Sequence, residues 1–343
     1  MSFTIRPTTA ADRPAIVSLL DGAGLQSRSE ERDLDWKYWQ PRPDWAQARS
    51  FVLAKDSEIL AHAGVVPSTC VWNGHRASIL HLIDWAAAPE SVGAGITLLK
   101  HIRWLADALI SVGGNDYSLQ ALPAIGFRPC STLTEYVRVL YPLRYLTNSP
   151  QWGWKTLPKL GRSFLWSLAA PSTKDAEWSW RRIAAKQLDG LDDVLPRARG
   201  NFAVLERSVS LFAYLLKCPL ASMAVYRLDK LGKTRGYFLL AFVPGQARLA
   251  DCWVDSDDAA DWQALVRCAV QAARQDPGVA ELIAVANDPL LSGALEKAGF
   301  RMRASHPVLV LLRKDHELPR TFRVQMLESD AAYRHRGYAI YLA

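Results

Sequence analysis

The stretch Ile79–Ile102, ILHLIDWAAAPESVGAGITLLKHI, decides how the first half of the chain is interpreted. Its apolar start, Ile79–Ile83, predicts a strand, and the apolar spacing from Leu98 to Leu105 predicts a helix. Between them lie Gly93 and Gly95, which lack a Cβ and so let the backbone come close to a ligand. The helix would turn its free N–H groups and its positive dipole end toward this loop. The stretch therefore predicts a phosphate or pyrophosphate site, although a plain tight turn explains two glycines equally well.

Composition sets broad limits on the class of protein. The chain has 343 residues, enough for about two domains, and half of them are apolar. No apolar run approaches the ~18 residues that span a bilayer, and the N-terminus lacks the pattern of a signal peptide, so we expect a cytoplasmic protein. Five scattered cysteines indicate reduced thiols and argue against a zinc site. A net charge of +7 favours anionic partners without naming one.

The pattern over residues 2–141 predicts the order strand, helix, three strands, glycine loop, helix, strand, helix, strand. Asn73-Gly74 is typical of a hairpin turn between two of these strands. The order resembles the GNAT acyltransferase superfamily, and three segments carry the resemblance: Ile5–Asp12, the loop Val92–Thr97, and Asn115 followed by Ala124-Ile125-Gly126-Phe127. In that superfamily the glycine loop holds the pyrophosphate of an acyl-coenzyme A. The last helix and its Gly-Phe turn flank the pantetheine and the acceptor.

A second copy of the pattern follows between residues 222 and 313. Lys297-Ala298-Gly299-Phe300 repeats the ending of the first copy, and this internal repeat of domain size makes the chain look like a tandem GNAT protein. The loop Val254–Ala260, however, has no glycine and carries three aspartates, whose carboxylates would repel a pyrophosphate. We therefore expect the second copy to lack the cofactor, to complete the core and to shape the acceptor cleft.

These patterns predict an α/β (α+β) fold of two tandem GNAT-like domains, each a mixed, mostly antiparallel twisted sheet flanked by helices. The expected ranges are 1–141 for the acyl-coenzyme A-binding domain, 142–185 for a Trp-rich basic linker, 186–316 for the second domain and 317–343 for a tail. The segment 142–182 carries five tryptophans and an excess of basic residues. It is either a peripheral contact for anionic lipid or polyanionic acceptor, or an inter-domain helix with buried tryptophans.

The resemblance also implies a set of residues that bind the cofactor. A backbone N–H at the end of the strand, at Trp85, Ala86 or Ala87, would polarise the thioester carbonyl. Val92 and Thr97 stand where the superfamily usually has Arg or Gln and Gly or Ala, which puts cofactor affinity in doubt. The expected cofactor-binding residues are Trp85, Ala87, Val92, Gly93, Ala94, Gly95, Ile96, Thr97 and Asn115, and no metal is expected.

Four residues are candidates for the proton transfers of catalysis. Asp84 interrupts an apolar strand, where burial would raise its pKa toward that of a useful base; the alternative is a structural aspartate that caps the loop. His62 is a rival base, as is His81, although a lone strand histidine is more often structural. The position of the superfamily's usual tyrosine acid is Leu122, so the leaving thiolate would take its proton from water or from Tyr117.

The sequence therefore predicts an N-acyltransferase that uses acetyl-coenzyme A or another acyl-coenzyme A. Direct transfer in a ternary complex would acylate an amine of a small molecule, an amino sugar, or a cell-surface or polysaccharide precursor. Two alternatives stay open. One is a non-catalytic GNAT-like binding module, which the missing loop residues favour. The other is a Fem-type aminoacyl transferase with a donor other than coenzyme A, although the chain shows no basic array of the size of a tRNA, and nucleic acid is not an expected partner.

Overall fold

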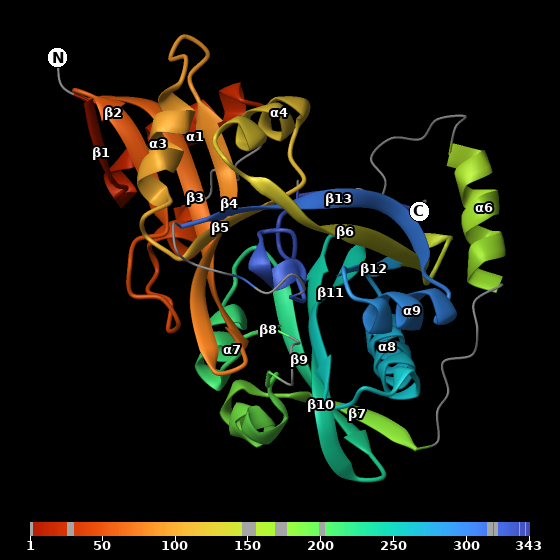
Figure 1. The fold of residues 1–343 in the computed structure, drawn as a ribbon. Coiled ribbons are helices and arrows are strands. Elements are labelled where there is room, and N and C mark those ends of the chain that lie inside the picture. The colour runs from red at the N-terminus through yellow and green to blue at the C-terminus, as the bar shows by residue number, and fades with distance from the viewer. Residues whose placement is uncertain are drawn as a thin grey trace. The chain divides into compact units, whose positions relative to one another are not determined.

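The chain forms two compact units in the computed structural model (Figure 1). The structure describes residues 3–25, 31–145, 156–168, 177–198, 203–313, 318, 322–335, 337–339 and 341–343. Unit 1 consists of Met1–Ser131, Ala198–Leu205 and Pro307–Phe322. Unit 2 consists of Thr132–Arg197, Glu206–His306 and Arg323–Ala343. Each unit therefore contains segments from both halves of the sequence.

The sheet of unit 1 has the strand order β1-β2-β3-β4-β5-β13. Its strands are β1 (Phe3–Pro7), β2 (Ser50–Lys55), β3 (Glu58–Trp72), β4 (His75–Ala87), β5 (Ala108–Val112) and the second half of β13 (Arg301–Leu312), and the short β8 (Val204–Leu205) pairs with β3. Neighbouring strands are antiparallel except β4 and β5. Asn73 and Gly74 both have positive φ between β3 and β4, which confirms the hairpin turn that the Asn-Gly pair predicts.

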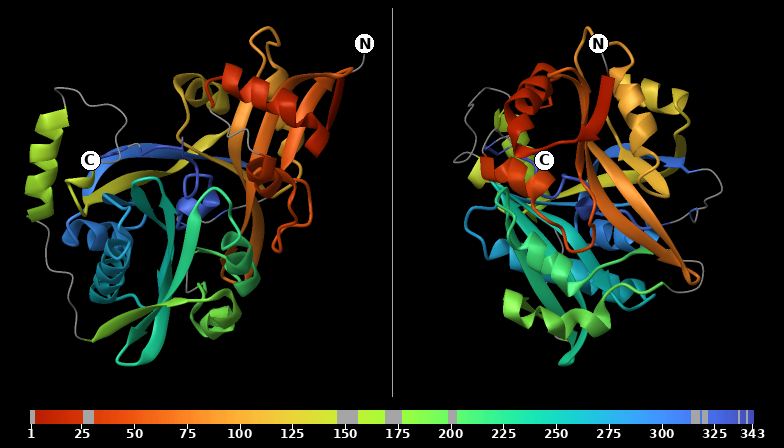
Figure 2. Two further views of the ribbon diagram at one scale, coloured as in Figure 1. Left: turned by 180° about the vertical axis from the view of Figure 1, so that it is seen from behind. Right: turned by 90° about the vertical axis from the view of Figure 1, so that its left-hand side faces the viewer.

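Helices cover both faces of this sheet (Figure 2). On one face, α1 (Arg13–Gly22), α2 (Glu31–Leu34) and the π-helix η2 (Asp35–Trp39), preceded by η1 (Ala10–Asp12), enclose a core that includes Val52 of β2. On the other face, α3 (Ala94–Ile102) and α4 (Asp116–Ala124) pack on a larger core that includes Phe51 and Leu53. The alternation along β2 explains the division, because successive side chains of a strand point to opposite faces.

A β-bulge in β4 changes which face each of its residues serves. The pairing of β3 with β4 slips between His62 and Gly64, so Asp84 and Trp85 together stand opposite Ala63. Asp84 takes a φ of +48° at this point. Strict alternation after Leu82 would send Asp84 toward α3. The bulge instead turns Asp84 toward η2 and Trp85 toward α3.

β4 also separates from β5, and it does so before the bulge. Their parallel pairing covers Ile79–His81 alone, while β4 continues to Ala87. The N–H of Ala88 donates back to the carbonyl of Leu60 on β3, at 2.8 Å. Because successive N–H groups of an extended strand point to opposite edges, the N–H of Ala87 points into the opening left by β5.

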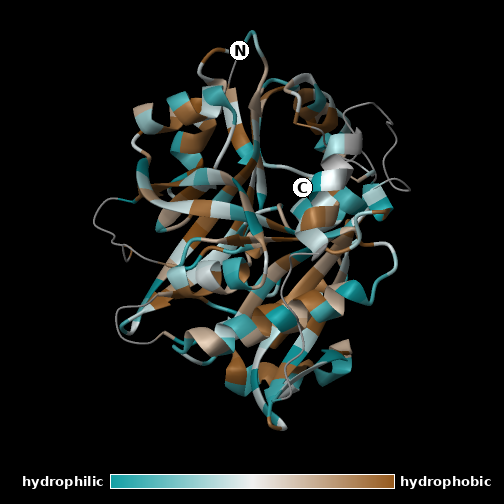
Figure 3. Cartoon of the chain, turned by 90° about the vertical axis from the view of Figure 1, so that its right-hand side faces the viewer, coloured by the Kyte–Doolittle hydropathy of each residue, from teal (hydrophilic) through white to brown (hydrophobic). Residues whose placement is uncertain are grey.

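The sheet of unit 2 has the order β6-β12-β11-β10-β9-β7, with the first half of β13 beside β6. The bounds are β6 (Arg128–Val139), β7 (Trp178–Ile183), β9 (Ser222–Lys230), β10 (Lys233–Val243), β11 (Gln246–Val254) and β12 (Glu281–Ala286). The helices are α6 (Thr156–Leu168), η3 (Ala185–Val194), α7 (Val209–Leu215), α8 (Ala259–Arg274), α9 (Pro289–Lys297) and η4 (Met326–Glu328). Apolar residues run along the strands and along one side of the helices (Figure 3). The predicted fold class, mixed and mostly antiparallel sheets flanked by helices, is confirmed.

The compact units differ from the contiguous ranges 1–141 and 186–316, because β6 and β13 each run from one unit into the other. Of the Trp-rich segment, 146–155 and 169–176 lie outside the described residues. Trp178 and Trp180 belong to β7, where Trp178 is buried and the indole of Trp180 donates to Gln271. Among the described helices, none is long and apolar enough to cross a membrane.

A pair of glycines in unit 2 tests this packing. A Cβ on Gly236 would lie 2.1 Å from the carbonyl oxygen of Trp253, whereas a Cβ on Gly293, in α9, would meet no heavy atom within 4 Å. Gly236→Ala should therefore lower the free energy of unfolding by about 3 kcal/mol, because main-chain atoms cannot rotate away. Gly293→Ala should raise it by roughly 0.5 kcal/mol. Urea denaturation of both variants measures this, and equal effects would contradict the packing of β10 on β11.

Candidate functional site

A cavity of about 370 Å³ lies in unit 1, where β4 leaves β5. The end of β4, the loop before α3, the first turns of α3 and α4, and the residues after α1 form its walls. No charged side chain is present among the described residues that line it. We call it the β4 cavity, and its lining is therefore made of main-chain groups, apolar side chains and a few hydroxyls and amides.

Most of the residues expected to bind the cofactor meet at the β4 cavity. The lining includes Trp85, Ala87, Val92, Gly93, Gly95, Ile96 and Asn115. The side chain of Val92 is 97% exposed. Two others lie off the cavity: Ala94 is buried at the start of α3, and Thr97 is exposed on its surface. Asn115 caps α4, with its Oδ1 accepting from the N–H and the hydroxyl of Ser118, both at 2.9 Å.

The two glycines of the loop have different tasks. Gly93 precedes α3 with a φ of +84°, and a Cβ there would point into open space. A Cβ on Gly95 would lie 2.9 Å from Nε1 of Trp85, whose indole donates to the carbonyl of Gly95 at 3.2 Å. The sequence interpretation gave both glycines to a ligand. The structure shows that Gly95 makes room for Trp85, which the bulge turns to this face.

The start of α3 presents donors to the β4 cavity. Its N-cap, Gly93, contributes no side-chain hydrogen bond, and the N–H of Ala94 is already used by the carbonyl of Ser91. The next N–H groups, of Gly95 and Ile96, belong to the first turn and have no partner within the helix. Together with the helix dipole they form a site that suits an anion, and no carboxylate in the lining opposes it.

Asp84 lies behind the β4 cavity, held by two residues of η2. Its Oδ2 accepts from Lys37 Nζ and from the hydroxyl of Tyr38, each at 2.5 Å. The side chains of Lys37 and Asp84 are 11% and 9% exposed. Lys37 and Tyr38 were missed from the sequence, because a polar and aromatic segment gives no periodicity from which a π-helix could be predicted.

His62 acts on Asp84 through the main chain. Its Nδ1 donates to the carbonyl oxygen of Asp84 at 2.9 Å, since a carbonyl can only accept. Its Nε2 therefore accepts from the hydroxyl of Ser50, also at 2.9 Å. Complete burial lowers the pKa of His62 to about 4. His62 is thus neutral near pH 7 and holds the bulge in place, and it does not line the β4 cavity.

The other tyrosine and histidine candidates are spread around the site. Tyr117 lies on α4, is 67% exposed and lines the β4 cavity. Leu122 is buried in the core beneath α4, and His81 is buried on β4. Tyr117 is therefore the candidate for proton transfer that the β4 cavity itself contains.

Unit 2 repeats the geometry around Asp84. The parallel pairing of β11 with β12 covers Gln246–Arg248 and then stops, as the pairing of β4 with β5 stops after His81. Asp84 is three residues beyond His81, and Asp251 is three residues beyond Arg248, so the two aspartates occupy corresponding positions. A bulge lies here too, with Ala250 as the additional residue directly before Asp251, whereas Asp84 is itself one of the two bulge residues of β4. Asp251 accepts from Arg207 at 2.9 and 3.0 Å and from the hydroxyl of Tyr237 at 2.8 Å.

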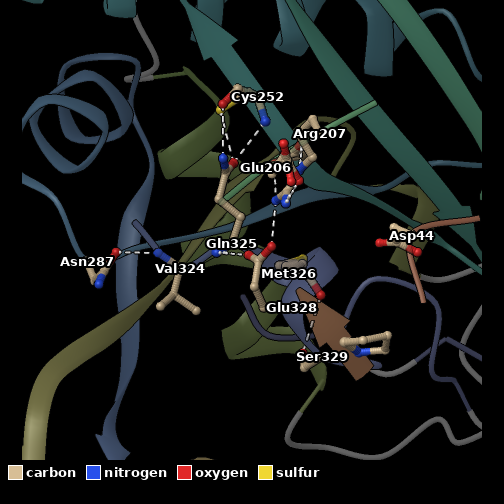
Figure 4. Close-up of polar contacts among 12 residues, drawn as sticks. Asp44, Glu206, Arg207, Cys252, Asn287, Val324, Gln325, Met326, Glu328 and Ser329 are labelled. Atoms are coloured by element: carbon tan, nitrogen blue, oxygen red, sulfur yellow. Dashed lines mark hydrogen bonds and ion pairs between the residues drawn. The ribbon is translucent and has the colours of Figure 1, made fainter. Parts of the chain in front are cut away.

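In unit 2 the C-terminal segment occupies the opening beside β11 (Figure 4). The side chain of Gln325 donates to the carbonyl of Cys252 at 3.0 Å and accepts from its N–H at 2.9 Å, in the manner of a neighbouring strand. Glu328 binds Arg207 at 2.5 Å and the N–H of Gln325 at 2.6 Å. Asp258 caps α8 by accepting from the N–H of Ala260. In unit 2, the main-chain groups of the strand edge and the start of the helix are therefore hydrogen-bonded within the chain, whereas the corresponding groups of unit 1 face the β4 cavity.

The burial of His62 leads to a pH-dependent stability. In the unfolded chain, His62 takes up a proton below a pKa of about 6.5. In the folded chain, the same imidazole takes it up only below about 4. The free energy of unfolding should therefore fall by roughly 3 kcal/mol as the pH drops from 6.5 to 4. In His62→Gln this component should be missing, and in His101→Gln, at an exposed position of α3, it should remain. Urea titrations at several pH values measure it; an identical pH dependence in His62→Gln would rule it out.

Gln325 gives a second test. Gln325→Met keeps the volume but leaves the N–H and the carbonyl of Cys252 buried without partners, which should cost roughly 2–4 kcal/mol of unfolding free energy. Gln275→Met, on an exposed residue after α8, is the matched control and should change stability little. Chemical denaturation compares the two. If both substitutions cost the same, Gln325 does not hold the segment in place.

Comparison with known proteins bears on the fold. No family model matches the sequence, and no curated protein matches it either. Among solved structures, N-myristoyltransferase of Saccharomyces cerevisiae with bound myristoyl-CoA matches with a TM-score of 0.61 and 14% identity, over 90% of this chain and 80% of that one. A tandem GNAT protein from the clavulanic acid biosynthesis pathway gives 0.57 and 12%, over 91% and 98%. A probable N-acyltransferase of Enterococcus faecalis V583 gives 0.58 and 11%, over 91% and 73%. The chain therefore has the fold of these GNAT and N-acyltransferase structures.

Proposed function

We propose that the chain is an acyl-coenzyme A-dependent N-acyltransferase, with acetyl as the first acyl group to test. One observation carries the proposal: the β4 cavity joins an unpaired strand edge at Ala87 to the uncapped start of α3 at Gly93. A long ligand with an amide-rich arm and a diphosphate matches these two ends. The solved structures of similar fold include N-acyltransferases, which supports the same reading.

The residues present fit such a ligand. The first turn of α3 offers N–H groups to the pyrophosphate, and Gly93 leaves open space there. Val92 is exposed and neutral, so it adds no charge, and the backbone has to supply the binding. Thr97, off the cavity, has no part in this proposal. Acyl-coenzyme A would supply the activated acyl group as a thioester.

The chain's own part in the reaction is to orient and to move protons. The N–H of Ala87 points into the opening, where it can donate to the thioester oxygen as negative charge develops. The amine nitrogen bonds to the carbonyl carbon, the C–S bond breaks, the amine proton passes to a base, and the thiolate takes a proton. Tyr117, which lines the β4 cavity, is our candidate donor to the thiolate.

We assign the base to Asp84. Its contacts with Lys37 and Tyr38 engage Oδ2, which leaves Oδ1 to accept the amine proton, and its neighbours Trp85 and Ala86 line the β4 cavity. His62 is the weaker candidate, because its pKa of about 4 makes it a poor base and both ring nitrogens are engaged. Its role in this proposal is to position Asp84.

We further propose that unit 2 binds no acyl-coenzyme A. Gln325 and Glu328 occupy the opening beside β11, and Asp258 already caps α8. Each chain should then bind a single equivalent of the donor. For the acceptor, the proposal at this stage is an amine of a small molecule, an amino sugar or a polysaccharide precursor. Contact of residues 142–182 with anionic lipid remains a separate expectation, because much of that segment lies outside the described residues.

Charge placed at the start of α3 tests the site. Val92→Glu should weaken acetyl-coenzyme A binding at least tenfold, because the new carboxylate repels the pyrophosphate. The Val92→Gln variant, which introduces a neutral side chain of the same shape as Glu, should bind as the wild type does. Asp84→Asn should keep this affinity and lose about 100-fold or more in kcat. Calorimetry and turnover on an amine panel measure both. Unchanged binding by Val92→Glu would place the donor elsewhere, and binding without turnover on any amine would favour a non-catalytic module.

A further inference from the structure

Unit 2 contains a helix, α6, whose apolar side is exposed; it is the yellow-green helix of Figure 1. Among the side chains of α6 that the structure describes, the exposed ones are Pro158, Gly161, Phe164 and Leu165. They recur every three or four residues or stand next to each other, so they share one face of the helix. Phe164 is 49% exposed and Leu165 is 67% exposed. None of the four carries a polar side-chain group, so this face, the α6 face, is apolar.

The opposite side of α6 is polar and packed. Ser163 is 1% exposed, and its hydroxyl is hydrogen-bonded to that of Tyr145, which donates to the buried Glu281 at 2.8 Å. Ser167, one turn further on, is half-buried. A surface helix of a globular protein normally buries its apolar side and exposes its polar side, so α6 is oriented the other way round. The hydrogen bond to Tyr145 fixes this orientation, because buried polar groups need partners.

Two cations border the α6 face. The guanidinium of Arg162 lies 4.8 Å from the ring of Trp166, and that of Arg303, on β13, lies 5.9 Å from the same ring. Neither guanidinium forms an ion pair with a carboxylate in the described part of the chain. Burial raises the pKa of Glu135 on β6, and Arg303 opposes this rise without contacting the carboxylate. Both arginines can therefore meet an anion from outside the chain.

The sequence around α6 strengthens this positive charge. Between Glu135 and Asp175 it contains no aspartate and no glutamate, and the charged residues of α6 itself are Lys159 and Arg162. An apolar helix face bordered by basic and aromatic residues is typical of helices that lie in the interface of a membrane with anionic lipids. The α6 face therefore matches a lipid surface in both polarity and charge.

Size and charge argue against a protein partner on the α6 face. A specific protein interface buries about 1,000 Å² or more, whereas here Phe164 and Leu165 are the large exposed side chains. A second copy would also bring Arg162 and Arg303 close to the same arginines of its partner, and like charges placed together disfavour association. The helix has 13 residues and is thus roughly 20 Å long, too short to span a bilayer core of about 30 Å.

We propose that α6 is a peripheral membrane contact that lies in the head-group region of an anionic bilayer. Phe164 and Leu165 enter the boundary of the acyl chains, and Arg162 and Arg303 meet the lipid phosphates. Of the two interpretations of the segment 142–182, this selects lipid contact for α6. The inference does not rest on the proposed acyltransferase function, because none of these four residues lines the β4 cavity.

Flotation of the whole chain with vesicles tests the proposal. Vesicles of equal parts phosphatidylcholine and phosphatidylglycerol should bind it at least tenfold more strongly than vesicles of phosphatidylcholine alone. The double variant Phe164→Ser, Leu165→Ser should bind the mixed vesicles at least tenfold more weakly, because it removes the apolar contact. Arg162→Gln should bind them about fivefold more weakly. Leu231→Ser is the matched control, at a leucine that is 74% exposed in the turn between β9 and β10, and should bind as the wild type does.

The outcomes are decisive once circular dichroism has shown that each variant is folded. Absent flotation, equal flotation with both kinds of vesicle, or flotation that the double variant leaves unchanged overturns the proposal. Sedimentation at several protein concentrations examines the other occupant: a dimer that the double variant abolishes would assign the α6 face to a second copy and also overturn it. Acetyl-coenzyme A binding that responds to Val92→Glu is expected whatever the vesicles show, so failure of one proposal is distinguishable from failure of the other.

Discussion

The bulge at Asp84 is the constraint on which the site in unit 1 depends. One additional residue in β4 reverses the alternation of its side chains, so that a carboxylate and an indole exchange faces. Asp84 has a positive φ, which is unfavourable for a residue with a Cβ, so contacts with neighbouring residues have to stabilise this conformation. Lys37 and Tyr38 hold its side chain, and His62 holds its carbonyl. The cost of the conformation is thus offset by contacts from two separate elements.

The two units share a bulged strand with a buried aspartate, but the strand edge beside it is open in unit 1 and closed in unit 2. Asp251 follows the bulge of β11 and Asp84 lies within the bulge of β4, and each carboxylate is bound by a cation and a tyrosine hydroxyl. In unit 1 the strand edge beyond the bulge opens on a cavity. In unit 2 Gln325 supplies one donor and one acceptor to Cys252 and closes the edge. A sheet edge left unpaired has to be satisfied by a ligand, by water or by the chain, and unit 2 uses the chain.

The buried charges of unit 2 illustrate what closure requires. Arg207 is buried and binds both Asp251 and Glu328, and burial raises the pKa of Glu328. Desolvation of three ionisable groups is costly, and such a group is weak evidence for net stability. Its geometric effect is clearer, because Arg207 joins β11 to the segment that carries Gln325. Arg207 contacts both carboxylate oxygens of Asp251, whereas Lys37 contacts Asp84 at Oδ2 alone and leaves Oδ1 for another hydrogen bond.

The sequence by itself determined the local elements: the hairpin at Asn73-Gly74, the strand and helix around Gly93, and the repeat that ends in Gly299-Phe300. Periodicity and turn chemistry act over a few neighbouring residues, so they can be recognised in the amino-acid sequence alone. Only the tertiary structure decided that Gly95 accommodates Trp85, that His62 supports Asp84, that Lys37 and Tyr38 join the site, and that Gln325 fills the second opening. These outcomes depend on a one-residue slip between strands and on contacts between distant segments. A register slip changes the face of every following residue and leaves no mark on composition or spacing.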